Sequence, residues 1–420
     1  MEVPATRRRA RSFSPVPSLI ALALGMTAGV IAHASGNEVL LSLKGYLEPF
    51  GYLWLRALRM IVFPLVISTL IVAILNNSKF ASAGRIGSAA LALFIVLLCA
   101  GGLFSFFAGS ALIGWLPEGS GAAMASVADG TRVLEDQALA TSMTFGDWLN
   151  SLVPINPFTA LAEGQLLPVI FFTVLFGLAL NQVEGPGRGV VHQFFEAIFG
   201  AMMTLVGWLL ILAPAAIFIL SLSFASNMGL DLAAILVNYL VMECSLLLLA
   251  TALLYPATCL LGGISLKRFA DGVLPAQLVA VSTRSSIASL PALLEGARHR
   301  MQMKSAVVDL VLPLAVAVFK VNRPITSMFG LLLLAHLFSI DLTTGQILVF
   351  FFTTLVLSFS SAGIPLGGSA MLSLPAYLAV GIPIEGYLLL KTVDSIPDIL
   401  KTLLNVTGDM SVAVILDRYF

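Results

Sequence analysis

Seven charged and polar residues near the C-terminus recur at intervals that place most of them on one face of a helix. They stand in "LKTVDSIPDILKTLLNVTGDMSVAVIL" and are Lys391, Asp394, Asp398, Lys401, Thr402, Asn405 and Asp409. At about 100° per residue, the six from Asp394 onward share one arc of roughly 100°, opposite a face of Ile, Leu and Val. Three carboxylates, an ammonium group and two neutral polar groups predict a site for a small charged molecule or an ion. The alternative is an amphipathic surface helix with a solvated charged face.

Two further cations lie inside an apolar run. Lys320 and Arg323 stand in "AVAVFKVNRPITSMFG". Pro324 predicts a break there, because it lacks an N–H donor and disfavours helix at Arg323. Charges within a membrane span usually face the bundle interior and pair with one another. The alternative is that both side chains extend to an interface. Glu243 is a further intramembrane acid, for which we expect extension to an interface or a contact with a neighbouring helix.

The composition identifies the elements that must position these residues as membrane-spanning helices. The 420 residues are 59% hydrophobic and only 10% charged, against about 25% charged in a soluble domain. Apolar windows predict spans near 17–35, 50–76, 86–115, 150–182, 194–224 and 231–263. "VPINPFTALAEGQ" interrupts the fourth. The fold class is therefore an all-α polytopic membrane protein, because a β-barrel would show short alternating strands. The net charge of zero gives no indication of a nucleic-acid partner.

Two later segments have a different pattern. "LPAQLVAVSTRSSIASLPALLEGARHRMQ" and "ILVFFFTTLVLSFSSAGIPLGGSAMLSLPAYLAVGI" each have two half-length apolar arms around a polar break. Such backbone is tolerated in a membrane only where protein or a water-filled cavity covers it. We predict two re-entrant hairpins with tips near 284–289 and 360–368, and paired interrupted segments point to a transporter substrate site. The alternative is two Ser-rich loops at the membrane surface.

The N-terminus predicts the orientation. "MEVPATRRRARSFSPVP" is basic, so we expect it to stay on the cytoplasmic side of a plasma (inner) membrane. The apolar run from Pro17 is interpreted as the first transmembrane helix, with a cleaved signal peptide ending near "AHASG" as the alternative.

Three cysteines in apolar windows, Cys99, Cys244 and Cys259, are interpreted as core residues.

Several motifs in order resemble one known family over nearly the whole chain. "TRSSIASLP" resembles a serine-rich first hairpin tip, "SAGIPLGGSAML" a second tip and "DILKTLLNVTGD" a last helix. "GYLWLRALRMIVFPLVISTLIVAI" and "NPFTALAEGQLLPVIFFTVLFGLAL" resemble the second and fourth helices. The family is that of the dicarboxylate/amino acid:cation symporters, which comprises the glutamate transporters and their prokaryotic homologues.

The resemblance implies a fold and a division of the chain. It implies eight transmembrane helices, two re-entrant hairpins and inverted repeats, in an elevator-type transporter that forms homotrimers. Residues 1–85 would hold scaffold helices 1 and 2, and 86–117 the third helix, which belongs to the transport domain. Residues 145–225 would hold scaffold helices 4 and 5. Residues 226–420 would complete the transport domain.

The resemblance also assigns substrate-binding residues. Asp398 matches the aspartate that receives a substrate amine, and Lys401 stands where an arginine binds a substrate carboxylate in members that carry acidic substrates. The other matching positions are Arg284, Ser285, Ser286, Gly363, Pro365, Thr402 and Asn405. Ile287 replaces a third hairpin serine.

The chain departs from the family at the sodium ligands. The seventh helix usually carries Asn-Met-Asp-Gly-Thr, and an ungapped alignment from "LVLPL" places residues 319–323, "FKVNR", there. A slipped alignment pairs Asn322 with the asparagine, and neither register restores the aspartate. In the third helix the tyrosine, threonine and serine ligands fall on Phe94, Leu97 and Leu98. Hard cations prefer oxygen ligands, so we expect sodium coupling to be weakened or lost.

The retained polar groups suggest what replaces the ion. We expect Lys320 to act as a built-in counter-ion, paired with Asp409 or otherwise with Asp394, because an unpartnered buried charge is costly. Arg323 would face the substrate and could bind an anionic group bidentately. No metal site is assigned, and a residual cation site at Asn405 and Asp409 is the alternative.

These features predict a secondary active transporter of a small anionic amino acid or a related carboxylate. The alternatives are an amine-free di- or tricarboxylate carrier or exchanger, and an uncoupled anion channel. We expect no enzyme, since the four histidines are scattered and no P-loop or dinucleotide fingerprint occurs. The expected partners are a small anionic substrate and the lipid bilayer. No cofactor is predicted, and the choice between sodium and proton coupling stays open.

Overall fold

The computed structural model describes residues 16–36, 38–81, 84–116, 153–359 and 368–420. These residues form helices and connections, without any strand in the part described. Seven helical segments are long and apolar enough to cross a membrane. The chain is therefore an all-helical membrane protein, as its composition predicts.

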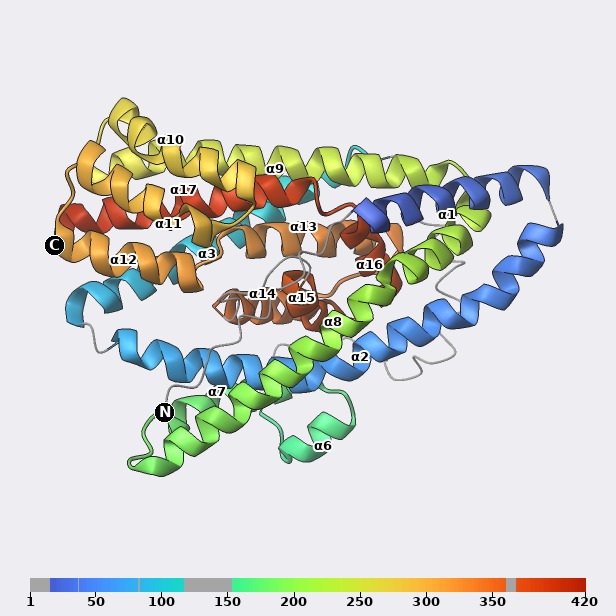
Figure 1. Ribbon diagram of the computed structural model, residues 1–420, viewed down its shortest axis with the longest axis horizontal. Helices are drawn as coiled ribbons and strands as arrows, with labels where there is room; N and C mark the ends of the chain where they lie inside the picture. Colours follow the sequence, from blue (N-terminus) through green and yellow to red (C-terminus); the bar gives the residue numbers. More distant parts are fainter. Residues whose placement is uncertain (1–15, 37, 82–83, 117–152, 360–367) are drawn as a thin grey trace, which may run out of the picture.

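The first half of the chain consists mostly of long helices. They are α1 (Val16–Ser35), α2 (Glu38–Ala81), α3 (Gly84–Ile113), α6 (Pro157–Ala162), α7 (Leu166–Leu180), α8 (Pro186–Met228) and α9 (Asp231–Gly262). The predicted spans at 17–35 and 231–263 correspond closely to α1 and α9. The interruption predicted in the fourth span is confirmed, because α6 and α7 are separate helices with Gly164 at φ +73° between them. Figure 1 shows α1, α2 and α8 packing along one side of the molecule.

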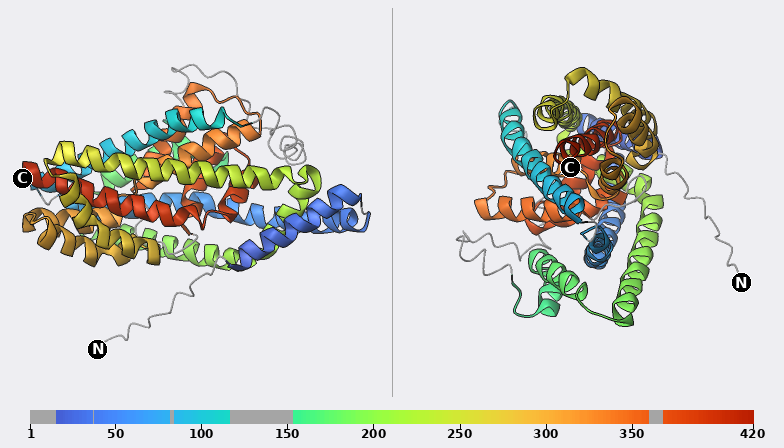
Figure 2. Two further views of the ribbon diagram at one scale, coloured as in Figure 1. Left: turned by 90° about the horizontal axis from the view of Figure 1, so that it is seen from above. Right: turned by 90° about the vertical axis from the view of Figure 1, so that its left-hand side faces the viewer.

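The second half consists of shorter, interrupted helices. They are α10 (Leu266–Thr283), α11 (Ser286–Glu295), the π-helix η2 (Gly296–Arg300), α12 (Ser305–Val318), α13 (Asn322–Leu337), α14 (Thr344–Ser358), α15 (Gly368–Ala379), α16 (Ile384–Thr392) and α17 (Pro397–Tyr419). α17 is in contact with α9, α10 and α12, and Figures 1 and 2 show it among them. The C-terminal helix thus packs between α9 of the first half and the shorter helices α10 and α12 of the second half.

The helices α10 and α11 form the first predicted hairpin. The chain reverses at Arg284, which has φ +53°, and at Ser285, whose hydroxyl accepts the Ala288 N–H at 3.3 Å and caps α11. Both lie in the predicted tip at 284–289. The two arms approach closely near their far ends, since a Cβ added to Gly296 would lie 2.0 Å from the Gly272 carbonyl oxygen. The second predicted tip, at 360–368, lies outside the described residues except for Gly368, which begins α15. The predicted site residues Gly363 and Pro365 are therefore also outside the described residues.

The break predicted near Lys320 is confirmed. α12 ends at Val318 and α13 begins at Asn322, with Phe319 in an extended conformation. Pro324 occupies the first turn of α13, where its missing N–H has no intrahelical partner to lose.

The prediction of one continuous helix from Lys391 to Asp409 is wrong. α16 ends at Thr392 and α17 begins at Pro397, so Asp394 lies in the connection between them. Proline favours the first position of a helix and disfavours helix at the residue before it, which is Ile396 here. The polar face of α17 therefore begins at Asp398.

Candidate functional site

The N-terminal half of α17 lies where four elements meet. They are α9, the α10–α11 turn, the α12–α13 break and the connection after α16. The residues that the sequence places in the candidate site are distributed over these elements, so the tertiary structure brings most of them toward α17.

Lys401 lies in a buried cluster of four charged groups, here called the ion-pair cluster (Glu243, Lys391, Asp394 and Lys401). The Lys401 ammonium group lies 3.1 Å from Glu243 Oε1 and also donates a short hydrogen bond to Asp394 Oδ1. Lys391 Nζ lies 3.3 Å from the same Asp394 oxygen. Tyr239 donates its hydroxyl proton to Asp394 Oδ1 at 3.2 Å. Two carboxylates and two ammonium groups leave the cluster with no net formal charge.

The cluster joins parts of the chain that are distant in sequence. Glu243 is on α9 and only 1% exposed, whereas Asp394 lies in the connection before α17 and is partly accessible. The expected contact of Glu243 with a neighbouring helix is confirmed by its pairing with Lys401. Because Asp394 also holds Lys391 and the Tyr239 hydroxyl, it has more partners than Glu243. A ligand that approaches Lys401 would therefore meet an ammonium group that is already paired.

Asn405 caps the second half of the interrupted helix. Its Oδ1 accepts the Asn322 backbone N–H at 3.1 Å. The first amides of a helix have no carbonyl partner within the helix, and an oxygen side chain normally satisfies one of them. A side chain from α17 performs that role for α13. Thr402, one turn earlier, donates its hydroxyl to the Asp398 carbonyl at 2.9 Å.

Asp398 differs from its neighbours because its carboxylate makes no ion pair or hydrogen bond with any residue the structure describes. It is half-buried in the first turn of α17, within electrostatic range of Lys401 and, more weakly, of Arg284 at the hairpin turn. Ser285 uses its hydroxyl as the α11 cap, and Ser286 begins that helix. Asp398 is thus a carboxylate free to accept a ligand's donor.

Arg323 is buried and directed at the end of α14. Its Nη1 donates to the Leu357 carbonyl at 3.3 Å. Leu357 lies in the last turn of α14, where a cation is favoured by the helix dipole. The structure therefore assigns Arg323 a capping contact, which leaves other guanidinium donors for the substrate contact that the sequence predicts.

Lys320 does not form the direct ion pair that the sequence predicts. Its ammonium group donates to the Val316 carbonyl at 2.6 Å. No carboxylate oxygen of the described residues lies within 4.0 Å of it, whether from Asp409 or from Asp394. The reason is local, since α12 ends at Val318 and leaves the Val316 carbonyl without a helical partner.

Asp409 is fully buried on α17, and neither of its carboxylate oxygens has a hydrogen-bond partner among the described residues. Lys320 is the cation that acts electrostatically on it. Burying an unpaired carboxylate is costly, so Asp409 requires a proton, an ion or the field of Lys320. Asn405, the other residue of the predicted residual cation site, is engaged with Asn322.

The positions that the resemblance assigns to sodium ligands form an apolar contact. Phe94 of α3 and Phe319 of the break stack with ring centroids 4.6 Å apart, and both are fully buried. Leu98 is buried in the same apolar cluster. Gly408 lets α17 approach this cluster, since an added Cβ would lie 3.0 Å from Val321 Cγ1 and 3.2 Å from Phe319 Cε1. Two aromatic rings therefore pack where the resemblance places side-chain oxygen ligands.

A second series of side-chain hydrogen bonds was not predicted from the sequence. Tyr255 donates its hydroxyl proton to Gln277 Oε1 at 3.0 Å, and Gln277 Nε2 donates to Thr407 Oγ1 at 2.8 Å. These two hydrogen bonds link α9, α10 and α17. The signal available in the sequence was Gln277 itself, an amide within an apolar helix that needs partners when buried.

Comparison with known proteins shows similarity over nearly the whole chain. The sequence profile of the sodium:dicarboxylate symporter family matches residues 16–419. The proton/sodium-glutamate symport protein of Bacillus subtilis (strain 168) is 28% identical over 402 residues, covering 95% of this chain and 91% of the relative. The proton/glutamate-aspartate symporter of Escherichia coli (strain K12) is 28% identical over 414 residues, covering 96% and 91%. The C4-dicarboxylate transport protein of Bacillus subtilis (strain 168) is 23% identical over 406 residues, covering 96% and 92%.

Proposed function

We propose that this chain, which belongs to the sodium:dicarboxylate symporter family, is a secondary active transporter of a small anionic amino acid. The family consists of transporters rather than enzymes, and the relatives are named for glutamate, aspartate and C4-dicarboxylates. The observation that carries the choice of an amino acid is Asp398, a half-buried carboxylate without a partner among the described residues. It would attract an amine and repel a plain dicarboxylate.

The substrate would lie between the α10–α11 turn and the first turns of α17. We place its amine at Asp398 and its α-carboxylate at Ser285 and Ser286, with Arg284 beside them. Thr402 would line the same space. Asn405, Gly363 and Pro365 remain proposed contacts on the strength of the resemblance alone.

Lys401 is the proposed partner of the substrate's side-chain carboxylate, and its pairing sets a condition on that role. A substrate carboxylate would exchange with Asp394 rather than with Glu243, because Asp394 is the more accessible and keeps Lys391 and the Tyr239 hydroxyl as partners. Arg323 would add positive charge from the end of α14. Lysine binds a carboxylate as a point charge, without the two-pronged fit of arginine.

The proposed coupling differs from that of sodium-driven members. The Phe94–Phe319 stack leaves no side-chain oxygen ligands at those positions. Lys320 would act on Asp409 across the break through its field, as a fixed cation in place of a transported one. A proton on Asp409 is the other way to neutralise it.

The proposed architecture follows the family. α7 together with the seven long spans would make eight transmembrane helices, and α10–α11 and α14–α15 would be the two re-entrant hairpins. Helices 1, 2, 4 and 5 would form the scaffold of a homotrimer, with the boundaries 1–85 and 145–225. Residues 86–117 and 226–420 would move as the transport domain of an elevator in the plasma membrane, with the N-terminus cytoplasmic.

The test is uptake by purified protein in proteoliposomes. We expect saturable aspartate or glutamate uptake of similar rate with and without a sodium gradient, and loss of that uptake in Asp398→Asn. Strict sodium dependence would contradict the proposed coupling while leaving the transporter assignment intact.

A C4-dicarboxylate carrier is the second candidate, favoured by the relative of that name and by the additional cation Arg323. Thermal-shift measurements with aspartate and succinate distinguish the two. Stabilisation by succinate alone would replace the amino acid proposal with this one.

A further inference from the structure

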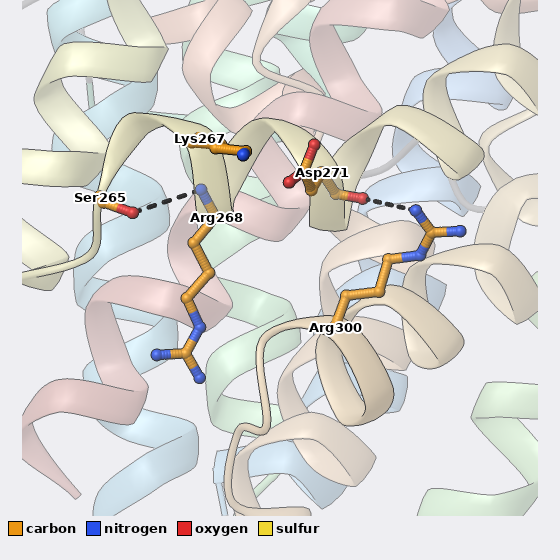
Figure 3. A pocket seen from close by; sticks show the side chains of 5 residues that line it. All are labelled: Ser265, Lys267, Arg268, Asp271 and Arg300. Atoms are coloured by element: carbon orange, nitrogen blue, oxygen red, sulfur yellow. Dashed lines mark hydrogen bonds between the residues drawn. The ribbon is translucent and has the colours of Figure 1, made fainter.

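A hollow of about 400 Å³ opens beside the connection between α9 and α10. Figure 3 shows the five residues that line it, which are Ser265, Lys267, Arg268, Asp271 and Arg300. The first four belong to the N-terminal turns of α10 and its cap, and Arg300 ends η2. Three cationic residues and one acidic residue therefore line the hollow, although the Arg268 guanidinium group extends away from Lys267 and Arg300 (Figure 3). The hollow lies at a distance along the chain from the residues of the candidate transport site.

The arginines are held in place by backbone carbonyl groups rather than by carboxylates. Arg300 Nη1 donates to the Asp271 backbone oxygen at 3.1 Å, as Figure 3 shows, and Arg268 donates to the Met301 carbonyl. Within the described part of the chain, neither these arginines nor Lys267 forms an ion pair. By contrast, Arg298 of the same π-helix pairs with Asp309. The hollow thus keeps a positive charge and unused guanidinium donors.

The start of α10 adds to this positive potential. α10 is an 18-residue helix capped by Ser265, whose hydroxyl accepts the Arg268 N–H at 3.4 Å. The remaining amides of the first turn lack helical partners, and the positive end of the helix dipole lies here. An anion with several oxygen atoms is the ligand that such a combination favours.

The hollow lies directly after the end of a membrane-spanning helix. α9 is a 32-residue apolar span that ends at Gly262, and Leu260 beside its end is 78% exposed. Leu261 and Leu266 are exposed as well. Apolar surface therefore passes into a cationic hollow within a few residues, which matches the boundary between the acyl chains and the headgroups of a bilayer.

We propose that this hollow binds the phosphate of an anionic phospholipid, whose acyl chains lie along the exposed leucines at the end of α9. The shared chemistry is an anionic, non-ester phosphate oxygen bound by Lys267 and Arg300. A soluble phosphate would satisfy the same cations but would gain nothing from Leu260. Basic pockets between membrane-spanning helices on the cytoplasmic side bind the headgroups of anionic lipids. The proposal does not depend on the transported substrate.

The test is native mass spectrometry of the purified full-length protein, titrated with phosphatidylglycerol in detergent. Lys267→Gln/Arg300→Gln removes two cations of the hollow and leaves Arg268 on its carbonyl. Arg298→Gln is the matched control, because it removes a cation of the same segment that Asp309 already neutralises. We expect affinity to fall about fivefold for each cation removed, or about 25-fold in the double variant, and less than twofold in the control. Equal losses in both variants, or none in the double variant, would overturn the proposal.

Two further arms identify the source of the phosphate. Leu260→Gln should weaken phosphatidylglycerol binding and leave any binding of inorganic phosphate unchanged. Phosphatidylcholine, whose headgroup is zwitterionic, should bind weakly to every variant. If inorganic phosphate displaces phosphatidylglycerol at equal concentration, the site takes a soluble phosphate and the lipid proposal is refuted. Size-exclusion profiles and unfolding midpoints matching the unmodified protein show that the variants are folded.

Discussion

Replacing Glu243 by glutamine tests whether the ion-pair cluster stabilises the fold. Glu243 Oε1 lies 3.1 Å from the Lys401 ammonium group, and the carboxylate is 1% exposed. At that distance and an effective dielectric constant of about 20, the attraction is about 5 kcal/mol. Removing one partner of a buried pair costs about 3–5 kcal/mol, because the other charge is left uncompensated. Since Asp394 still contacts Lys401, we expect the lower value, about 3 kcal/mol.

The measurement is the free energy of unfolding in mixed detergent micelles, followed by circular dichroism. Glu196→Gln is the matched control, because Glu196 is exposed on α8 and should change the value by less than about 0.5 kcal/mol. Glu243→Gln/Lys401→Met removes both members of the pair and leaves Asp394 with Lys391. We expect the double variant to lose about 2 kcal/mol less unfolding free energy than Glu243→Gln and Lys401→Met lose together as single variants. If the losses add, or if Glu243→Gln equals the control, the cluster contributes no coupling and the reasoning is refuted.

Two other predictions concern single contacts. Asn405→Leu removes the acceptor of the part-buried Asn322 N–H and should cost about 1 kcal/mol of unfolding free energy, because that amide loses its partner. Asn405→Asp keeps the acceptor, and an equal loss there would argue against the cap. Gly330→Ala should destabilise the protein, since its Cβ would lie 2.5 Å from the Tyr377 hydroxyl, and Tyr377→Phe should restore part of the loss. Gly207→Ala, which meets no atom within 4 Å, is the control, and a similar fall in melting temperature would contradict the steric explanation.

The features predicted correctly from the sequence have local causes. Apolar length predicts the spans, Pro324 predicts the break before α13, and the Ser-rich motif predicts the hairpin turn at Arg284. Each signal lies within a few residues of the structure it produces. The prediction failed where one local signal competed with another, as when the helical periodicity through Asp394 outweighed the boundary that Pro397 imposes.

The partners of the charged residues could not be predicted in the same way. The packing of α9, α12 and α17 determines whether Lys401 pairs with Glu243. It also determines whether Lys320 reaches Asp409 or only the Val316 carbonyl. Such contacts join residues far apart in the chain, and periodicity carries no information about them. The amino-acid sequence thus specifies which groups must be satisfied within the membrane, because burying them unpaired is costly. Helix packing specifies which group satisfies which, because hydrogen bonds and ion pairs form only within a few ångströms.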